Sequence, residues 1–226
     1  MTRRTGHRVK RAVDIVAALL GLLLLSPVIV LVGAAVRWRL GSPVLFRQLR
    51  TGREGRRFSA RKFRTMTEAR DLSGNLLPDD VRLTRLGRLL RTLSLDELPQ
   101  LLNVLRGDMS IVGPRPLLPK YDAWYSSEER RRFLARPGIT GLAQVAGRNR
   151  VGWADRLSLD VEYVERWSLW LDCTILVRTV AMVLRRDGVV EDPRALMRDL
   201  DDERAQQQTE EMAHLTRDVQ ALLRAG

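Results

Sequence analysis

A long uncharged segment near the N-terminus constrains the fold of this chain more than any other feature. Residues 15–36, IVAALLGLLLLSPVIVLVGAAV, contain no charged side chain over 22 positions. A straight α-helix of that length would extend about 33 Å, which is enough to cross the apolar core of a bilayer. The segment is longer than the apolar part of a signal peptide, and no small-x-small cleavage pattern follows it. A membrane helix is therefore favoured over a cleaved signal peptide.

Basic residues flank this segment on both sides, and a Ser-Pro pair lies near its middle. Lys and Arg beside a membrane segment favour the cytoplasmic side, so both ends are expected there. Pro27 removes a helical N–H and clashes with the preceding turn, while Ser26 can hydrogen-bond a freed backbone group. We therefore expect a re-entrant hairpin that breaks at Ser26 and Pro27, with a straight transmembrane span as the alternative.

Charge is unevenly distributed along the chain. The net charge of the 226 residues is +12, but residues 187–226 hold 5 Arg against 10 acidic residues, so residues 1–186 carry +17. Such a surplus favours an anionic partner, which could be a nucleic acid, lipid headgroups or nucleotides. Cys173 is the only cysteine, and the two histidines lie far apart in sequence. Neither a Ser-His-Asp relay nor a His/Cys metal centre is expected.

The periodicity of the remaining sequence predicts mostly helices. Residues 43–66 predict a β-hairpin around the turn from Gly52 to Gly55, and 82–93 predict an amphipathic helix suited to a membrane surface. The tail, about 191–224, predicts a single amphipathic helix. The other expected elements are helices at 99–106 and 126–135, two helices within 154–185 divided near Asp172, a short strand at 109–112 and a turn at 136–141.

Two adjacent carboxylates, Asp96 and Glu97, stand in the stretch SLDELP. One interpretation is a capping box, in which Ser94 caps a helix and Glu97 reaches back to it. Pro99 argues against that register, because its ring would oppose the carbonyl four residues earlier. We expect the helix to begin at Pro99, with both carboxylates just ahead of an N-terminus that favours anions.

Basic residues near this pair leave several roles open. Arg91 and Arg115 are close in sequence, and Lys62 and Arg148 are more distant candidates. An ionised Asp96 among cations can form a structural ion pair, hold a divalent metal or attack phosphorus. Lys62 is one of three lysines among 39 basic residues, and its compact ammonium suits a point contact to phosphate. Since salt-bridged caps are common, these residues alone do not choose between structure and catalysis.

Six ordered motifs, read together, add a resemblance that covers about residues 9–186. They are KRAVDIV, the central Ser26-Pro27, PVLFRQLRTGREGRRFSARKFRTM, LDELPQLLNVLRGDMSIVGPRP, RPGITGLAQVAGRN and LDVEYVERWSLWLD. The chain resembles the bacterial sugar transferase family, in particular the small monotopic polyprenyl-phosphate phosphoglycosyl transferases. The implied fold is α+β and mostly helical, with a re-entrant membrane hairpin helix, a small β-hairpin and amphipathic interfacial helices around a compact cytosolic site.

The resemblance also implies an activity and a set of site residues. A sugar-1-phosphate would pass from a UDP-sugar to polyprenyl (undecaprenyl) phosphate with release of UMP, which begins surface-glycan assembly. Asp96 would be the nucleophile that forms a covalent phospho-sugar intermediate, and Glu97 would assist the Mg²⁺ cofactor or the second half-reaction, with both acids as candidate metal ligands. The residues implied around the substrate are the phosphate-binding Lys62, Arg91, Arg115 and Arg148 and the pocket-shaping Pro114 and Pro116.

The implied organisation has three parts and a membrane location. Residues 1–40 form the basic N-terminus and re-entrant helix, 41–186 the catalytic domain, and 187–226 an acidic helical extension that matches no family motif. We expect a minimal, stand-alone form at the bacterial inner membrane, with lipid contacts and the site on the cytoplasmic face. Self-association through the C-terminal helix is one candidate role for the extension.

Three other functional classes are alternatives to a sugar transferase. Aromatic residues interleaved with basic ones are too sparse for a single-strand nucleic-acid platform, so no nucleic-acid partner is expected. Adjacent carboxylates diverge, whereas a glycosidase needs two that face each other across a sugar. The main alternative is a non-catalytic, membrane-bound basic scaffold that binds anionic lipids. That alternative predicts no loss of function when Asp96 is neutralised.

Overall fold

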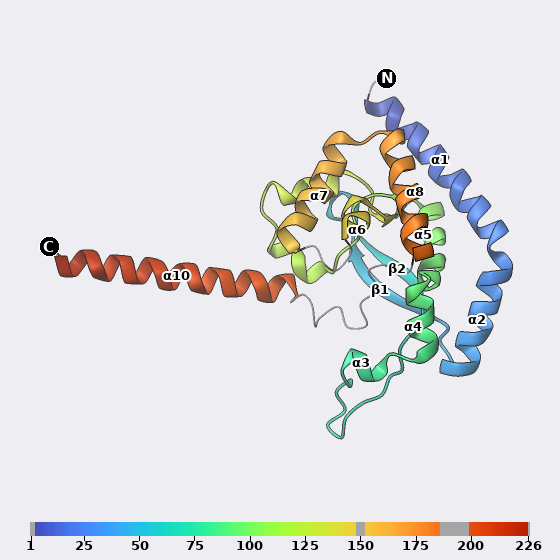
Figure 1. The fold of residues 1–226 in the computed structure, drawn as a ribbon, viewed down its shortest axis with the longest axis horizontal. Coiled ribbons are helices and arrows are strands. Elements are labelled where there is room, and N and C mark those ends of the chain that lie inside the picture. The colour runs from blue at the N-terminus through green and yellow to red at the C-terminus, as the bar shows by residue number, and fades with distance from the viewer. Residues whose placement is uncertain (1–2, 148–151, 186–198, 226) are drawn as a thin grey trace.

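The computed structural model describes residues 3–147, 152–185 and 199–225. Helices surround two small two-stranded sheets, which agrees with the predicted α+β, mostly helical class (Figure 1). The helices are α1 (Arg3–Leu24), α2 (Ser26–Leu40), α3 (Asp79–Arg82), α4 (Arg85–Thr92), α5 (Leu101–Arg106), α6 (Leu142–Gly147), α7 (Trp153–Arg166), α8 (Leu169–Arg185) and α10 (Leu200–Ala225).

The apolar N-terminal segment forms two helices that meet at Leu25 with a bend of 63°. Pro27 has no N–H for the carbonyl of Leu23, four residues earlier, and the Ser26 hydroxyl donates to that carbonyl instead at 2.8 Å. The predicted break is therefore confirmed. No single described helix has the length and hydropathy to cross a membrane, and only the bent pair Gly6–Leu24 with Ser26–Leu40 meets both criteria together. Insertion of this pair into a bilayer stays a prediction.

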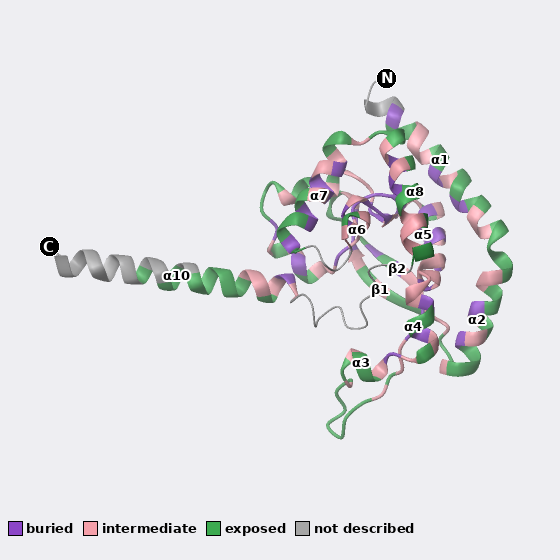
Figure 2. Ribbon diagram, viewed as in Figure 1, coloured by how far each residue is buried: buried purple, intermediate pink, exposed green. Residues whose placement is uncertain are grey.

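Polar contacts fasten the first half of the bent pair to the rest of the molecule. Asp14 is buried and accepts from the Ser110 hydroxyl at 2.9 Å and the Ile111 N–H at 3.0 Å. Arg11 caps the end of α5 by donating to the carbonyls of Val104 and Leu105 at 2.6 and 3.0 Å. Large apolar side chains of α1 and α2 nevertheless remain exposed (Figure 2), among them Leu19, Leu23, Leu24, Val30 and Leu31.

The predicted hairpin is confirmed as β1 (Leu45–Thr51) paired antiparallel with β2 (Arg57–Phe63). A short 3-10 turn at Arg53–Gly55 joins them, with positive φ at Glu54 and Gly55. The register pairs Phe46 with Lys62, so Lys62 lies near the end of β2. This hairpin supplies one wall of the site described below.

The second sheet pairs β3 (Ser110–Val112) with β4 (Gly138–Thr140) in parallel. The strand at 109–112 was predicted, but its partner lies where the sequence indicated a turn. The two backbones approach very closely, because a Cβ added to Gly138 would lie 2.1 Å from the backbone nitrogen of Gly113. The glycines that resemble turn residues therefore serve close strand packing.

Several helix predictions need correction. Asp96 and Glu97 lie inside a 3-10 helix, η2 (Leu95–Gln100), and α5 follows it from Leu101, so Pro99 does not begin the helix. Residues near 126–135 form only a 3-10 helix, Glu129–Leu134. The two helices predicted within 154–185 are confirmed as α7 and α8, but the break between them lies at 167–168, and Asp172 falls in the first turn of α8. The break falls just before α8 because Ser168 accepts the N–H of Leu171 at its start.

The amphipathic helix predicted at 82–93 begins at Arg85, where Thr84 caps it by accepting from the Gly87 N–H at 2.9 Å. Its buried Leu90 packs with Val36 of α2 and Phe63 of β2. Leu89 is 53% exposed. Part of the apolar face therefore belongs to the core, and contact of this helix with a membrane surface stays a prediction.

The C-terminal helix α10 projects from the body (Figure 1). Leu200 is fully buried at its start among Tyr121, Trp153 and Leu157. Lys120 bonds to Asp199 and Asp201 at 2.8 and 2.9 Å. The predicted tail helix is confirmed from Leu200 onward, and its first residues, 191–198, lie outside the described part of the chain.

Candidate functional site

The two carboxylates do not form the capping box considered above. Ser94 takes a left-handed conformation, with φ 55°, and its side chain caps nothing. The chain then turns into η2, which is held by packing of the buried Pro99 and Gln100. Asp96 is 7% exposed. Because Asp96 is buried on a short 3-10 helix, it is not an ordinary solvent-exposed charge.

Glu97 is the ion-paired member of the two. The Lys62 ammonium donates to Oε1 of Glu97 at 2.5 Å, and Nη2 of Arg115 donates to the same oxygen at 3.2 Å. Burial disfavours the charged carboxylate, but the charges and hydrogen bonds of Lys62 and Arg115 outweigh it and lower the pKa of Glu97 to about 2. Glu97 is therefore ionised at neutral pH and gathers two cations beside Asp96.

Asp96 has a different environment. Among the described residues, its carboxylate accepts no hydrogen bond and forms no salt bridge. Burial raises its pKa to about 6; the charge of Lys62 opposes this rise, Glu97 adds to it, and Arg91 and Arg115 oppose it. Adjacent carboxylates thus have pKa values displaced in opposite directions, which is characteristic of sites where one acid reacts and the other organises charge.

Arg91 approaches the pair from α4. Its Nε donates to the Thr65 hydroxyl at 3.1 Å, and Thr65 follows β2 in the chain. The helix and this segment are in close contact, since a Cβ on Gly87 would lie 1.9 Å from the Thr65 carbonyl oxygen. Glycine at this position therefore allows α4 to bring Arg91 within electrostatic range of Asp96.

The Pro-Arg-Pro turn is held from behind by a buried ion pair. Nη2 of Arg132 donates to the Arg115 carbonyl at 2.6 Å and to Asp160 at 2.7 Å. The side chains of Arg132 and Asp160 are 2% and 1% exposed. Pro114 is buried, and its carbonyl accepts from the Gly138 N–H at 2.9 Å. Arg115 is therefore presented from a rigid turn, while Pro116 is only partly buried.

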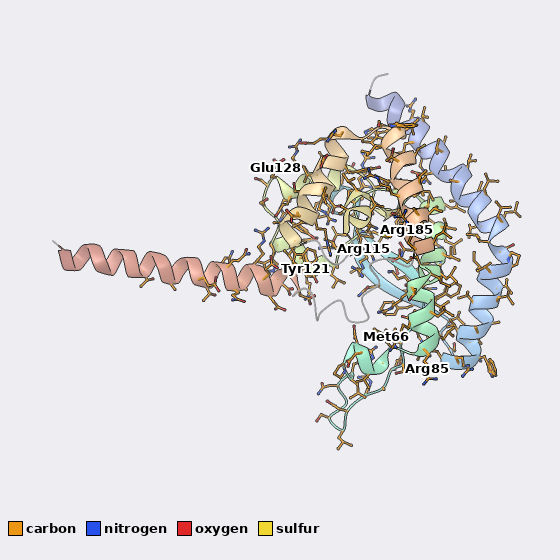
Figure 3. The ribbon with its side chains drawn as sticks, in the orientation of Figure 1. Met66, Arg85, Arg115, Tyr121, Glu128 and Arg185 are labelled. Atoms are coloured by element: carbon orange, nitrogen blue, oxygen red, sulfur yellow. The ribbon has the colours of Figure 1, made fainter. Side chains whose placement is uncertain are left out.

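Sequence reasoning predicted most of these residues and missed two. Lys62, Arg91 and Arg115 surround the carboxylate pair, whereas Arg148 lies outside the described residues. Arg132 and Asp160 were not predicted. Asp160 stands in the motif LDVEYVERWSLWLD, but nothing in the run ERRRF distinguishes Arg132 from its neighbours. Figure 3 shows Arg115 near the middle of the molecule.

The donor set at the carboxylate pair fits a hard divalent cation. Both bonds to Glu97 use Oε1, so Oε2 accepts none from the described residues, and neither does the Asp96 carboxylate. Mg²⁺ prefers such oxygens together with water and substrate phosphates. A separate acidic group, Asp199, Asp201 and Asp202, also has suitable spacing, but Lys120 already bonds to two of its members.

Comparisons with known proteins show which sequences this chain is similar to. The family model for bacterial sugar transferases matches residues 5–186. The uncharacterized sugar transferase EpsL of Bacillus subtilis is 53% identical over 180 residues, which cover 80% of this chain and 89% of that protein. The UDP-glucose:undecaprenyl-phosphate glucose-1-phosphate transferase of Caulobacter vibrioides is 46% identical over 191 residues, or 79% of this chain and 71% of that protein. The undecaprenyl-phosphate galactose phosphotransferase of Salmonella typhimurium is 40% identical, covering 83% of this chain and 43% of that protein.

Proposed function

Because this chain belongs to the bacterial sugar transferase family and is therefore a transferase, we propose that it moves a sugar-1-phosphate from a UDP-sugar to polyprenyl phosphate. The names of two relatives support this donor and acceptor, since one acts on UDP-glucose and both act with undecaprenyl phosphate. The reaction would begin the assembly of a surface glycan. One of these relatives is named for glucose and the other for galactose, so their names do not identify the sugar that this chain transfers.

The proposed chemistry proceeds in two displacements at one phosphorus. An Asp96 carboxylate oxygen attacks the sugar-bound phosphorus, and the bond from that phosphorus to the bridging oxygen breaks, so that UMP leaves with the oxygen. A phosphate oxygen of the polyprenyl phosphate then attacks the same phosphorus and restores the free carboxylate. The observation that carries this proposal is a buried Asp96 without a bonded partner among the described residues, next to three cationic side chains.

The surrounding charges make attack by an anion feasible. Lys62, Arg91 and Arg115 offset the negative charge of a diphosphate, which would otherwise repel the carboxylate. Glu97 orients Lys62 and Arg115 through its own hydrogen bonds. Because these donors are already fixed before substrate binds, little reorganisation is needed as charge develops at phosphorus.

Mg²⁺ is part of the proposal, with Asp96 and Glu97 as the residues that would hold it beside the substrate phosphates. When bound, the ion would neutralise phosphate charge and polarise the phosphorus–oxygen bonds. The free carboxylate oxygens described above support this assignment. The remaining steps depend on the chain's own residues.

The bent pair α1–α2 supports a membrane location. Its exposed apolar side chains and the basic residues at both ends suit a re-entrant anchor in the bacterial inner membrane, with the site on the cytoplasmic face. A polyprenyl phosphate carries its phosphate at the interface, so the acceptor need not leave the lipid to react. The anchor therefore has a function in acceptor delivery.

One assay tests the function against the basic-scaffold alternative. Purified full-length protein is incubated with Mg²⁺, undecaprenyl phosphate and a panel of UDP-sugars, and UMP release is measured. We expect release with at least one donor, none for Asp96→Asn, and unchanged release for Asp80→Asn, whose carboxylate is exposed on α3. Membrane attachment should persist in both variants. Absence of UMP with every donor, or full activity of Asp96→Asn, would reject the proposal.

A second copy of this chain is a proposed partner for α10. The helix extends 26 residues from a buried anchor at Leu200, and the spacing of Met212, Leu215, Val219 and Leu222 gives its sequence an apolar stripe. Deletion of 205–226 retains the anchor. We expect this deletion to lower the molar mass of the protein–detergent complex without changing turnover per chain, as measured by light scattering and UMP release.

A further inference from the structure

We propose that Arg50 and Arg115 form a second phosphate subsite, which holds the nucleotide phosphate of the donor and of the UMP product while Asp96 reacts with the sugar-bound phosphorus. The identity of this ligand rests on the proposed function. The ligand class, a phosphate monoester or the corresponding end of a diphosphate, follows from the two guanidinium groups themselves.

Arg50 and Arg115 meet from different elements. Arg50 is near the end of β1, and its Nη1 donates to the Pro116 carbonyl at 3.3 Å. The backbone N–H of Thr51 donates to the Leu117 carbonyl at 3.2 Å and fastens the same strand end to the turn. The guanidinium of Arg50 therefore lies against the Pro-Arg-Pro turn that presents Arg115, which itself reaches Glu97 beside Asp96.

The region around Arg50 and Arg115 holds more cationic side chains than unpaired carboxylates. Among the described residues, Arg50 forms no salt bridge, although Arg57, at the other end of the hairpin turn, pairs with Asp122. Two of the carboxylates that act on Arg115 have other cationic partners, since Glu97 also binds Lys62 and Asp160 binds Arg132; the third is Asp96, the proposed nucleophile. The side chain of Arg115 is 39% exposed, and the one hydrogen bond that it donates among the described residues runs from Nη2 to Glu97.

The electrostatic environment supports the same assignment. Burial and the charge of Arg115 lower the pKa of Arg50 to about 10. Arg156 of α7, which stacks 4.9 Å from the centre of the Trp153 ring, also has its pKa lowered by burial and by Arg115. Cations held close together repel one another, and an anion shared between them offsets that repulsion. A bound phosphate is the ligand that this arrangement favours.

The subsite lies on the side suited to the nucleotide. Tyr121 and Tyr125 lie near Arg50, and Tyr121 packs with Trp153 and with Leu200 at the start of α10. Figure 3 shows Tyr121 beside α10, with Arg115 between it and the α1–α2 pair. In each displacement the attacking and leaving oxygens lie on opposite sides of the phosphorus, so UMP departs on the side away from Asp96. The acceptor phosphate takes that same side after UMP has left, and the Arg50–Arg115 subsite would hold UMP until then.

Binding of UMP and of uridine tests the subsite, because the two ligands differ only in the phosphate. Equilibrium titrations use the full-length protein, Arg50→Gln, Arg50→Lys and the control Arg47→Gln, which alters an exposed arginine on the opposite face of β1. We expect Arg50→Gln to weaken UMP binding about 10- to 100-fold and to leave uridine binding unchanged, since one charge-assisted contact is lost. Arg50→Lys should bind UMP with intermediate affinity, and the control should match the wild type.

Separate outcomes distinguish this proposal from the proposed function. Equal losses of UMP and uridine affinity, with a lower melting temperature in both Arg50 variants, would show a structural role and overturn the subsite. Unchanged UMP affinity with a higher KM for polyprenyl phosphate would assign the subsite to the lipid and overturn its nucleotide identity. Wild-type protein that binds UMP no better than uridine would also overturn it, even if turnover proceeds. Arg50-dependent UMP binding without UMP release from any UDP-sugar would reject the function and support the subsite.

Discussion

Lys62 and Glu97 are 35 residues apart in sequence, yet the Lys62 ammonium lies 2.5 Å from Oε1 of Glu97. This contact joins the end of β2 to η2 and fixes a cation beside Asp96. Because Glu97 takes Lys62 and Arg115 as partners, Asp96 is left without a bonded cation among the described residues. Glu97 therefore holds two cations in place, and the proposed role of Asp96 as nucleophile requires the unpaired carboxylate that results.

Replacement of Lys62 tests how much that cation contributes to kcat/KM. We expect Lys62→Met to lower kcat/KM for the UDP-sugar about 10- to 100-fold, because a hydrogen bond to a charged group and its field at phosphorus are both lost. The matched control is Lys120→Met, since Lys120 pairs with Asp199 and Asp201 at the base of α10. Initial rates of UMP release measure both variants. Equal rates for Lys62→Met and wild type would exclude Lys62 from phosphate binding.

The pH dependence of turnover reports the ionisation of Asp96. A nucleophile whose pKa is about 6 should give a kcat/KM that rises through about pH 6 and levels off above it. Glu97→Gln removes a negative charge that raises this pKa, so the rising limb should move to lower pH while the maximal rate falls. Profiles of both proteins, measured with one UDP-sugar, provide the comparison. A limb that stays in place in Glu97→Gln would contradict the proposed coupling.

Asp96→Asn should stabilise the folded protein at neutral pH while it abolishes turnover. Burial raises the pKa of Asp96 from 3.8 to about 6, so the favourable contribution of the protonated form is complete below about pH 4 and is lost as the pH rises through about 6. A shift of about two units corresponds to at most about 3 kcal/mol at pH 8. Denaturation in detergent at pH 4 and pH 8 measures the difference, with Asp80→Asn as the control. A less stable Asp96→Asn at pH 8 would show that the carboxylate is a structural ion pair.

Features set by local sequence were predicted well. The break at Leu25 follows from Pro27 and Ser26, and the hairpin follows from apolar residues around a glycine turn. The cations around Asp96 were also predicted, although the resemblance, rather than spacing, linked Lys62 to a residue 34 positions away. Most residues of the candidate site could therefore be predicted from local chemistry together with the order of the motifs.

Features set by distant contacts were not predictable in the same way. The parallel β3–β4 pair depends on close approach of Gly113 and Gly138, which resemble turn residues in sequence. The Arg132–Asp160 ion pair joins positions 28 residues apart, and its role is visible only because Arg132 also donates to the Arg115 carbonyl. The 3-10 form of η2 arises from tertiary packing around Asp96 and Pro99, which overrides the helix start that Pro99 alone favours.

The bend at Pro27 yields a test of topology. In a Cys173→Ser background, which removes the exposed native thiol, Arg8→Cys and Arg39→Cys place one label site on each flank. We expect both thiols to react with a membrane-impermeant reagent from the cytoplasmic side of inverted vesicles. Pro27→Leu restores a helical N–H and should move the two flanks toward opposite sides. Labelling of the two flanks from opposite sides in the protein that retains Pro27 would establish a span and remove the re-entrant anchor.

The proposed mechanism requires that Asp96 becomes esterified by the sugar phosphate. The direct measurement is mass spectrometry of protein mixed with its UDP-sugar and Mg²⁺ in the absence of polyprenyl phosphate, then quenched and digested. We expect a sugar-phosphate adduct on the peptide that contains Asp96, one UMP released per adduct, and loss of the adduct when undecaprenyl phosphate is added. Turnover with acceptor present, but with no adduct and no UMP burst in its absence, would contradict it.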